Sequence, residues 1–265
     1  MSHQARKRFG QHFLHDPAVI QRIIYAINPK SDDHLVEIGP GQGAITAHLL
    51  AACGQLDVIE LDRDLVPVLE KQYGDDPRFR LHQGDALKFP FCDLWPADEQ
   101  AAKLRITGNL PYNISTPLLF HLLEHRHCIK DMHFMLQKEL VDRIVAHPGD
   151  NHYGRLGIML SYFCQSENLM SIGPGAFRPP PKVDSAIVRL VPHASPPVEV
   201  NDLALLSRVV TQAFSQRRKT LRNSLKKMLD ADEISQLDIN PTERPEQLSL
   251  AEFARLANAI HNKAV

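Results

Sequence analysis

Residues 35–46 read Leu35-Val36-Glu37-Ile38-Gly39-Pro40-Gly41-Gln42-Gly43-Ala44-Ile45-Thr46, an apolar run that leads into three closely spaced glycines. A helix-forming stretch follows at residues 47–52. This order predicts a buried strand, a glycine-rich turn and a helix. Glycine lets the backbone approach a ligand closely, and the N-terminus of a helix presents free N–H groups. The glycine spacing differs from the dinucleotide-binding fingerprint, so the stretch by itself does not identify the ligand.

Polar residues stand at the ends of three further predicted strands. Glu60 follows the glycines by roughly 20 residues, where an acid can bind ribose hydroxyls. Asp85 can accept a hydrogen bond from an adenine amino group, and Asn109 closes the fourth strand. The four predicted strands cover residues 35–38, 56–62, 79–81 and 104–108. Doubly wound sheets bind ligands at strand carboxyl ends, so Gly39, Glu60, Asp85 and Asn109 in this order predict a class I methyltransferase that binds S-adenosylmethionine.

The tetrapeptide Asn109-Leu110-Pro111-Tyr112 combines a planar amide, a backbone carbonyl and an aromatic ring. An exocyclic amine on a heteroaromatic ring is a poor nucleophile until acceptors hold its two hydrogens. Asn109 and the Leu110 carbonyl can supply those acceptors, and Tyr112 can supply a stacking face. Taken alone, the tetrapeptide fits equally well a proline-directed turn with a buried tyrosine.

Composition and cysteine usage predict a cytoplasmic protein. The chain has 265 residues and a formal net charge of −1. Its four cysteines, Cys53, Cys92, Cys128 and Cys164, lie far apart without metal-ligand spacing, so we expect four reduced thiols and no metal site. No stretch is apolar for long enough to cross a membrane, and no oligomerisation helix is evident, so we expect no membrane partner and a monomer.

Four further motifs carry a resemblance to a known family. They are Arg8-Phe9-Gly10-Gln11-His12-Phe13-Leu14, Phe134-Met135-Leu136-Gln137-Lys138-Glu139, Phe177-Arg178-Pro179-Pro180-Pro181-Lys182-Val183-Asp184-Ser185 and Gln216-Arg217-Arg218-Lys219-Thr220. Together with the glycine turn and the tetrapeptide, they resemble the bacterial small-subunit (16S) ribosomal RNA adenine dimethyltransferases of the KsgA type. The resemblance covers nearly the whole chain. One departure is His12, where the family usually has asparagine.

The resemblance implies an activity and a set of site residues. The expected reaction transfers methyl groups from S-adenosylmethionine to two adjacent adenosines near the 3′ end of 16S ribosomal RNA in the small subunit, with a role in subunit biogenesis. The implied cofactor-binding residues are His12, Leu14, Gly39, Gly41, Glu60, Asp85 and Asn109. The implied catalytic residues are Asn109, Leu110, Tyr112 and Phe177. We expect direct transfer without a covalent enzyme intermediate or a general base.

The proline-rich turn after Phe177 has two interpretations. Three consecutive prolines stiffen an extended loop, which can simply end a helix. The resemblance favours the other interpretation, in which the loop fixes Phe177 beside the cleft. The target adenine would then stack between Tyr112 and Phe177, at roughly 1–3 kcal/mol per base. Because the base must leave its stack, we expect an unpaired loop or helix end as the substrate.

The sequence predicts a methyltransferase domain at residues 1–191, a proline-rich linker at 192–200 and a small all-α domain at 201–265. In the last domain we expect helices at 203–214 and 218–229, and a final helix opened by the capping box Ser249-Leu250-Ala251-Glu252. In the first domain, Thr116 and Pro117 predict a helix start.

A basic segment in this last domain predicts contact with RNA. Residues 203–229 hold seven basic residues and no acid, and the resemblance assigns RNA contact to Arg217, Arg218, Lys219 and Arg222. A solvated helix face is the alternative. The basic N-terminus has two interpretations. It is either a solvated tail or a segment that helps to close the site on RNA.

Two other functions stay open. One is a large-subunit ribosomal RNA adenine methyltransferase. The proline-rich turn and the Gln216 to Lys219 segment favour the small-subunit family instead. The other is a ribosome-assembly binding factor whose methylation is secondary. A DNA adenine methyltransferase is less favoured, because no duplex-reading module is visible in the sequence.

Overall fold

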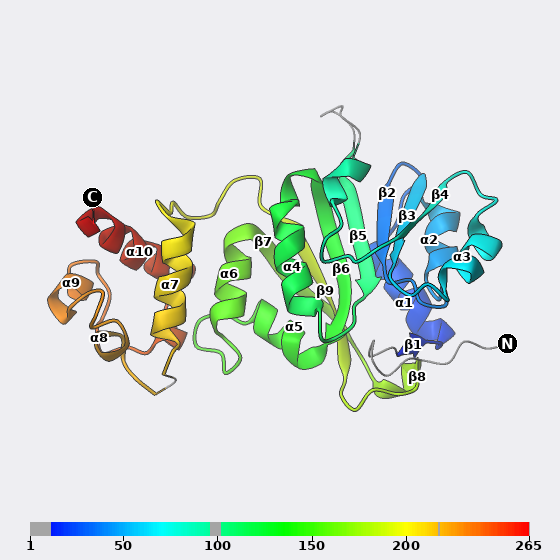
Figure 1. The fold of residues 1–265 in the computed structure, drawn as a ribbon. Coiled ribbons are helices and arrows are strands. Elements are labelled where there is room, and N and C mark those ends of the chain that lie inside the picture. The colour runs from blue at the N-terminus through cyan, green and yellow to red at the C-terminus, as the bar shows by residue number, and fades with distance from the viewer. Residues whose placement is uncertain (1–11, 96–101, 217, 265) are drawn as a thin grey trace. The chain divides into compact units, whose positions relative to one another are not determined.

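A seven-stranded sheet forms the centre of the larger part of the molecule (Figure 1). The computed structural model describes residues 12–95, 102–216 and 218–264. The strand order is β4-β3-β2-β5-β6-β9-β7. The strands are β2 (His34–Ile38), β3 (Gln55–Glu60), β4 (Phe79–Gln83), β5 (Leu104–Asn109), β6 (Ile129–Gln137), β7 (Cys164–Ile172) and β9 (Ser185–Pro192).

Strand direction and register bring the expected site residues to one edge of this sheet. β2, β3, β4, β5 and β6 run parallel, and β9 pairs antiparallel with β6. Ile38 lies opposite both Ile59 and Gly108, so the glycine turn, Glu60 and Asn109 follow at neighbouring strand ends. The prediction of an α/β fold with a mostly parallel sheet is confirmed.

Helices connect the parallel strands. They are α1 (Pro17–Ile27), α2 (Thr46–Ala52), α3 (Val66–Tyr73), α4 (Ser115–Glu124), α5 (Lys138–Val145) and α6 (Arg155–Phe163), with short 3₁₀ turns η2 (Phe91–Leu94), η3 (Arg126–Cys128) and η4 (Pro174–Ala176). The sequence placed the start of α4 slightly too far along the chain. Its N-cap is Ile114, without a side-chain hydrogen bond, and Ser115 Oγ donates instead to the Pro111 carbonyl at 3.0 Å.

Two segments far apart in the chain form a second, small sheet. Strand β1 (Phe13–Leu14) pairs antiparallel with β8 (Phe177–Arg178), with Leu14 opposite Phe177. Both Leu14 and Phe177 belong to the apolar core around α1 and β2. This pairing places the segment that begins at His12 beside the carboxyl ends of the central strands.

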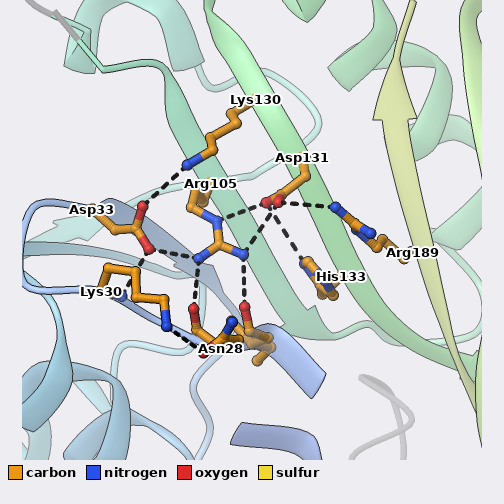
Figure 2. Close-up of polar contacts among 9 residues, drawn as sticks. Asn28, Lys30, Asp33, Arg105, Lys130, Asp131, His133 and Arg189 are labelled. Carbon is orange, nitrogen blue, oxygen red and sulfur yellow. Dashed lines mark hydrogen bonds and ion pairs between the residues drawn. The ribbon is translucent and has the colours of Figure 1, made fainter. Parts of the chain in front are cut away.

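The amino ends of the central strands hold a buried ion-pair cluster around Arg105 (Figure 2). The guanidinium group donates to Asp33 at 2.5 Å and to both carboxylate oxygens of Asp131 at 2.9 and 3.1 Å. It also donates to the carbonyls of Ile27 at 2.6 Å and Asn28 at 3.2 Å. Although burial opposes ionisation, these bonds hold the pKa of Asp33 below its usual value. The cluster ties the end of α1 to the start of β5 and β6.

The chain divides into two compact units by its backbone contacts. One comprises residues 1–141 and 167–192, and the other comprises 142–166 and 193–265. The second unit has its own apolar core, built from Ile158, Met159 and the helices that follow residue 200. Those helices are α7 (Leu203–Ala213), α8 (Leu221–Ser224), α9 (Ala231–Ser235) and α10 (Leu250–Ala264), with a 3₁₀ turn η5 (Pro245–Gln247).

Two of the three helix predictions in this unit are confirmed. α7 matches the first, and the capping box opens α10, since Ser249 N donates to Glu252 at 2.7 Å and Glu252 N to Ser249 Oγ at 3.3 Å. The helix expected at 218–229 is wrong, because α8 ends at Ser224. Bends and turns follow at residues 225–228, and a second capping box, between Asp230 and Glu233, starts α9 after them.

The cysteines differ from expectation. Cys92 and Cys128 are joined by a disulfide, although they lie 36 residues apart, whereas Cys53 and Cys164 are buried and belong to no disulfide among the described residues. The expectation of four reduced thiols is therefore wrong for this pair. Its sulfurs meet because η2 and η3 lie against one another, which separation along the chain does not reveal. Among the helices described, none is long and apolar enough to cross a membrane.

Candidate active site

A cavity of about 390 Å³ opens at the carboxyl ends of β2, β3 and β5. Nine residues predicted from the sequence line it: His12, Leu14, Gly39, Gly41, Glu60, Asp85, Asn109, Leu110 and Tyr112. Residues from at least four separate segments thus meet at one place. The cavity lies wholly within the first compact unit.

The glycine turn after β2 shapes the floor of this cavity. The backbone φ values of Gly39, Gly41 and Gly43 are 65°, 59° and 80°. Residues other than glycine rarely adopt such values. A Cβ atom on Gly39 would meet nothing within 4 Å, whereas one on Gly41 would lie 3.2 Å from the Phe13 ring. Open space therefore stands over the backbone at Gly39, and β1 covers the turn at Gly41.

Glu60 carries an acceptor without a partner. It is the last residue of β3 and is buried, and its Oε1 accepts a hydrogen bond from Asp62 N at 2.8 Å. Its Oε2 is buried and accepts no hydrogen bond from the part of the chain that the structure describes. Burial raises the pKa of Glu60, and the backbone N–H groups of Asp62 and Gly41 offset part of that rise. A buried acceptor left unpaired is costly, which indicates that a donor from a ligand completes it.

Glu37, on β2, is a second buried carboxyl group in the cavity wall. Its Oε2 accepts a hydrogen bond from Thr46 Oγ1 at 2.7 Å. Burial raises the pKa of Glu37 to about 8, against the lowering effect of the Thr46 hydrogen bond, and nearby Glu60 raises it further. Glu37 therefore holds its proton at neutral pH and contributes no negative charge there.

Asp85 and Leu61 offer different surfaces to a ligand. Asp85 is half-buried, and its Oδ1 accepts a hydrogen bond from Leu87 N at 3.0 Å, which fixes the carboxylate at the turn after β4. Leu61 lines the same cavity with a side chain that is 51% exposed. An apolar side chain that is exposed beside an acceptor suits a flat heteroaromatic ring with an amino group.

Asn109 is oriented by the N-terminal segment. Its Nδ2 donates to the His12 carbonyl at 3.1 Å. No bond to its Oδ1 occurs within residues 12–95, 102–216 and 218–264, so the acceptor half of the amide is available to a substrate. The Leu110 N–H donates to the Met135 carbonyl at 3.2 Å. This hydrogen bond anchors the backbone of Leu110, which lines the cavity.

Tyr112 is held from two sides. Its hydroxyl is 3.1 Å from Ser185 Oγ on β9, and its ring stacks on the His12 ring with centroids 6.0 Å apart. His12 Nδ1 lies 2.7 Å from the Pro179 carbonyl oxygen, so the imidazole bridges the proline-rich turn and Tyr112. These contacts fix the plane of the tyrosine ring at the mouth of the site.

Phe177 does not line the cavity in this structure. Its side chain is 2% exposed and belongs to the apolar core with Leu14 and Ile23. The expected pair of stacking rings therefore differs from the observed arrangement, in which Tyr112 alone of the two reaches the cavity. The reason is the pairing of β8 with β1, which turns Phe177 inward opposite Leu14.

The predicted RNA-binding residues lie in the second compact unit. Arg218, Lys219 and Arg222 are exposed, and no ion pair to them is found in the part of the chain that the structure describes. Arg217, like residues 8–11 of the first motif, lies outside the described residues. Unpaired surface cations of this kind are available to phosphates.

Cavity residues that were not among the predicted site residues include Glu37, Leu61 and His133. Glu37 precedes the first glycine by two positions, so an acid there was a usable signal. Leu61 follows the predicted ribose-binding acid directly. His133 gave no signal in the sequence, because it lies within the apolar run of β6. Burial there lowers the pKa of His133 to about 4.

Comparisons with known proteins agree with this geometry. A model of the family described as "Ribosomal RNA adenine dimethylase" matches residues 2–262. The chain is 60% identical to ribosomal RNA small subunit methyltransferase A of Pseudomonas aeruginosa, over 97% of this chain and 95% of that protein. It is 58% identical to the protein of the same name from Marinobacter nauticus, over 97% of this chain and 92% of that one.

Solved structures show the same fold. A dimethyladenosine transferase from Plasmodium falciparum superposes with a TM-score of 0.79 and 28% identity, over 96% of this chain and 99% of that one. The 23S rRNA methyltransferase ErmE has a TM-score of 0.74 and 23% identity, over 94% and 99% of the two chains, which concerns the fold alone.

Proposed function

The chain belongs to the ribosomal RNA adenine dimethylase family, and from that premise we propose that it dimethylates the exocyclic amino groups of two adjacent adenosines near the 3′ end of 16S ribosomal RNA. The substrate particle is the small ribosomal subunit, and the methyl donor is S-adenosylmethionine. The observation that carries the proposal is the meeting of Glu60, Asp85 and Asn109 in one cavity beside the glycine turn. The reaction places the protein in the cytoplasm, where subunits assemble.

The residues of the cavity fit the methyl donor. The unpartnered Oε2 of Glu60 accepts from a ribose hydroxyl, and Asp85 accepts from the adenine amino group, whose ring rests on Leu61. Open space over Gly39 admits the amino-acid part close to the backbone. When bound, S-adenosylmethionine supplies a methyl group on a positively charged sulfur, which needs no further activation.

Asn109 and Leu110 prepare the accepting nitrogen. Asn109 Oδ1 and the Leu110 carbonyl accept from its two hydrogens, which turns the lone pair out of conjugation with the ring. The same two oxygens stabilise the positive charge that develops on nitrogen during transfer. The proton then leaves to solvent, so these residues act by position and charge and not as bases.

Tyr112 supplies the stacking face for the target base. Its ring is held by Ser185 and His12, so little rotational freedom is lost when the base arrives. Phe177 supports this wall from within the core, beneath β1. The cavity receives a base that has left its stack, which favours unpaired adenosines.

The exposed cations Arg218, Lys219 and Arg222 hold the RNA backbone. They contact phosphates, which adds affinity that falls with salt and carries no base sequence information. We place a single chain on each subunit. We assign RNA binding to the helices that follow residue 200, within the second compact unit.

The experiment combines the protein and S-adenosylmethionine with small subunits that lack their modifications, and measures dimethyladenosine in the digested RNA by mass spectrometry. Matched reactions contain large subunits, deproteinised RNA or adenine-containing DNA. We expect dimethyladenosine at two adjacent positions of 16S RNA in the small-subunit reaction, and none in large subunits or DNA. Product in large subunits alone, or binding without methylation of any RNA, would overturn the proposal.

A further inference from the structure

A cluster of sulfur and nitrogen donors lies away from the cavity, at η2 and η3. Cys92, His127 and Cys128 each offer one ligand atom, and these atoms all lie within 4.8 Å of one another. Cys92 belongs to η2, while His127 and Cys128 end η3 directly before β6. None of the three lines the cavity of the candidate active site. The methylation proposed above makes no use of them.

We propose that, once the Cys92–Cys128 disulfide is reduced, these three side chains bind a divalent cation of the Zn²⁺ type. A dithiol or phosphine reductant supplies the two electrons, two protons come from the reductant or from water, and the S–S bond is replaced by two S–H bonds. The cation then displaces one proton from each thiol and binds two thiolates and an imidazole nitrogen. The protons pass to the buffer, and no other redox step occurs.

The donor set selects this class of cation. Thiolates and imidazole prefer Zn²⁺ and its chemical relatives, whereas Mg²⁺ and Ca²⁺ take oxygen ligands. Two cysteines and one histidine are a common set of three protein ligands for zinc. A disulfide is rare in a reducing cytoplasm, so the pair is expected to be available as thiols where ribosomes assemble.

Distances around the cluster match a tetrahedral site. Metal–sulfur and metal–nitrogen bonds of about 2.3 and 2.0 Å put neighbouring ligand atoms roughly 3.5–3.8 Å apart. Cys92 Sγ is 4.0 Å from His127 Nδ1. The His125 carbonyl oxygen is 3.5 Å from Cys92 Sγ and 3.0 Å from Cys128 Sγ, so it stands nearest the fourth position. Only the two bonded sulfurs have to separate, which follows from reduction itself.

A cation can reach the cluster from solvent. His127 is exposed, Cys92 is half-buried and Cys128 is buried, so the donors run from the surface inward. No ion pair to His127 is found within residues 12–95, 102–216 and 218–264. Its imidazole is therefore available as a ligand without breaking an existing ionic contact.

The test compares reduced and oxidised forms of the full chain. The protein is reduced with a phosphine, freed of reductant without air, and titrated with Zn²⁺ or Co²⁺. Bound metal is counted by mass spectrometry of the native protein, and the thiolate-to-cobalt absorption reports sulfur ligation. We expect one cation per reduced chain and none per oxidised chain, with the cobalt band in the reduced form only.

Variants assign the ligands. Cys92→Ser and Cys128→Ser should lose the cobalt band, and His127→Ala should weaken binding at least tenfold. The matched controls Cys53→Ala and His152→Ala should bind as the wild type does, with circular dichroism as the measure of folding. No binding to the reduced chain, or equal binding to reduced and oxidised chains, would overturn the proposal whether or not the variants fold. Full binding by Cys92→Ser would overturn it as well.

Discussion

The buried charged groups at the two ends of the central sheet differ in how fully their hydrogen bonds are satisfied. At the amino ends, the Arg105 guanidinium makes hydrogen bonds to Asp33, to both oxygens of Asp131 and to two backbone carbonyls (Figure 2). All five N–H donors of an arginine are thereby used. At the carboxyl ends, Glu60 keeps one buried oxygen without a partner. Within the described residues the Arg105 guanidinium is fully satisfied, whereas the Glu60 carboxylate is not; the one other buried side-chain atom without a partner there is Nε of Arg189, at the edge of the Arg105 cluster.

This difference separates stability from binding. A satisfied buried cluster contributes to folding, because removing one member leaves the others as unpaired buried charges. An unsatisfied acceptor costs stability in the free protein and returns that free energy only when a ligand donates to it. Substitutions at the amino ends should therefore act on unfolding, and substitutions at the carboxyl ends on ligand affinity and turnover.

The largest effect is expected from Arg105→Met. It leaves Asp33 and Asp131 with the longer contacts to the cations of Lys130 at 3.5 Å and Arg189 at 4.0 Å, so the free energy of unfolding should fall by about 3–5 kcal/mol. Urea denaturation followed by circular dichroism measures it. The control is Arg78→Ala, which breaks an exposed pair with Asp76 and should change stability far less than Arg105→Met does. Equal losses in the two variants would mean that the buried cluster contributes no more to stability than an exposed ion pair does.

Asn109→Ala comes next, and it acts on turnover. Loss of one acceptor for the charge that develops on nitrogen should lower kcat by about 10²–10³-fold. The hydrogen bond to the His12 carbonyl is also lost, which should cost only about 1 kcal/mol of stability. Single-turnover methyl transfer to small subunits measures the rate. An unchanged rate would show that Asn109 does not hold the amine.

Tyr112 tests the stacking wall with two substitutions. Tyr112→Ala removes the ring and should weaken RNA-substrate binding by roughly 1–3 kcal/mol, seen mainly in KM. Tyr112→Phe keeps the ring and loses only the contact with Ser185, so it should stay close to wild type. If both variants were equally impaired, the hydroxyl and not the ring would be the important group.

The effect confined to one range of pH is a change in the pH dependence of stability with Glu37→Gln. The pKa of Glu37 rises from its ordinary value of 4.5 to about 8 in the folded protein. Between these values the folded state holds a proton that the unfolded chain has released, so Glu37 lowers stability progressively as pH rises from about 4.5 to 8. The glutamine variant should lose this slope. Denaturant midpoints measured across that pH range for both proteins check it, and parallel curves would contradict it.

The sequence was sufficient for the strands that carry the site and for nine of the residues that line the cavity. Parallel strands bring their carboxyl ends to one edge, so the order of Gly39, Glu60, Asp85 and Asn109 along the chain becomes an order along that edge. Polar residues at strand ends and the Ser249 capping box are local signals, which survive folding because they depend on neighbouring backbone. The confirmed predictions are of this local or periodic kind.

The differences arose where distant segments meet. Phe177 is buried because β8 pairs with β1, and Cys92 meets Cys128 because η2 packs on η3. The helix expected at 218–229 is only four residues long, and the capping box at Asp230 starts a separate helix beyond it. Only the last of these left a readable signal in the sequence, and it was outweighed by the run of helix-compatible residues before it.

The central claim is that the carboxyl ends are incomplete until the methyl donor binds, and Glu60→Gln tests it most directly. The amide keeps the shape of the side chain and an oxygen that can accept from Asp62 N. Calorimetric titration with S-adenosylmethionine should show affinity reduced at least about tenfold, while the thermal midpoint of the free protein stays equal or rises, since a buried carboxylate with a raised pKa has been neutralised. Unchanged affinity, or a loss of stability like that of Arg105→Met, would contradict the account.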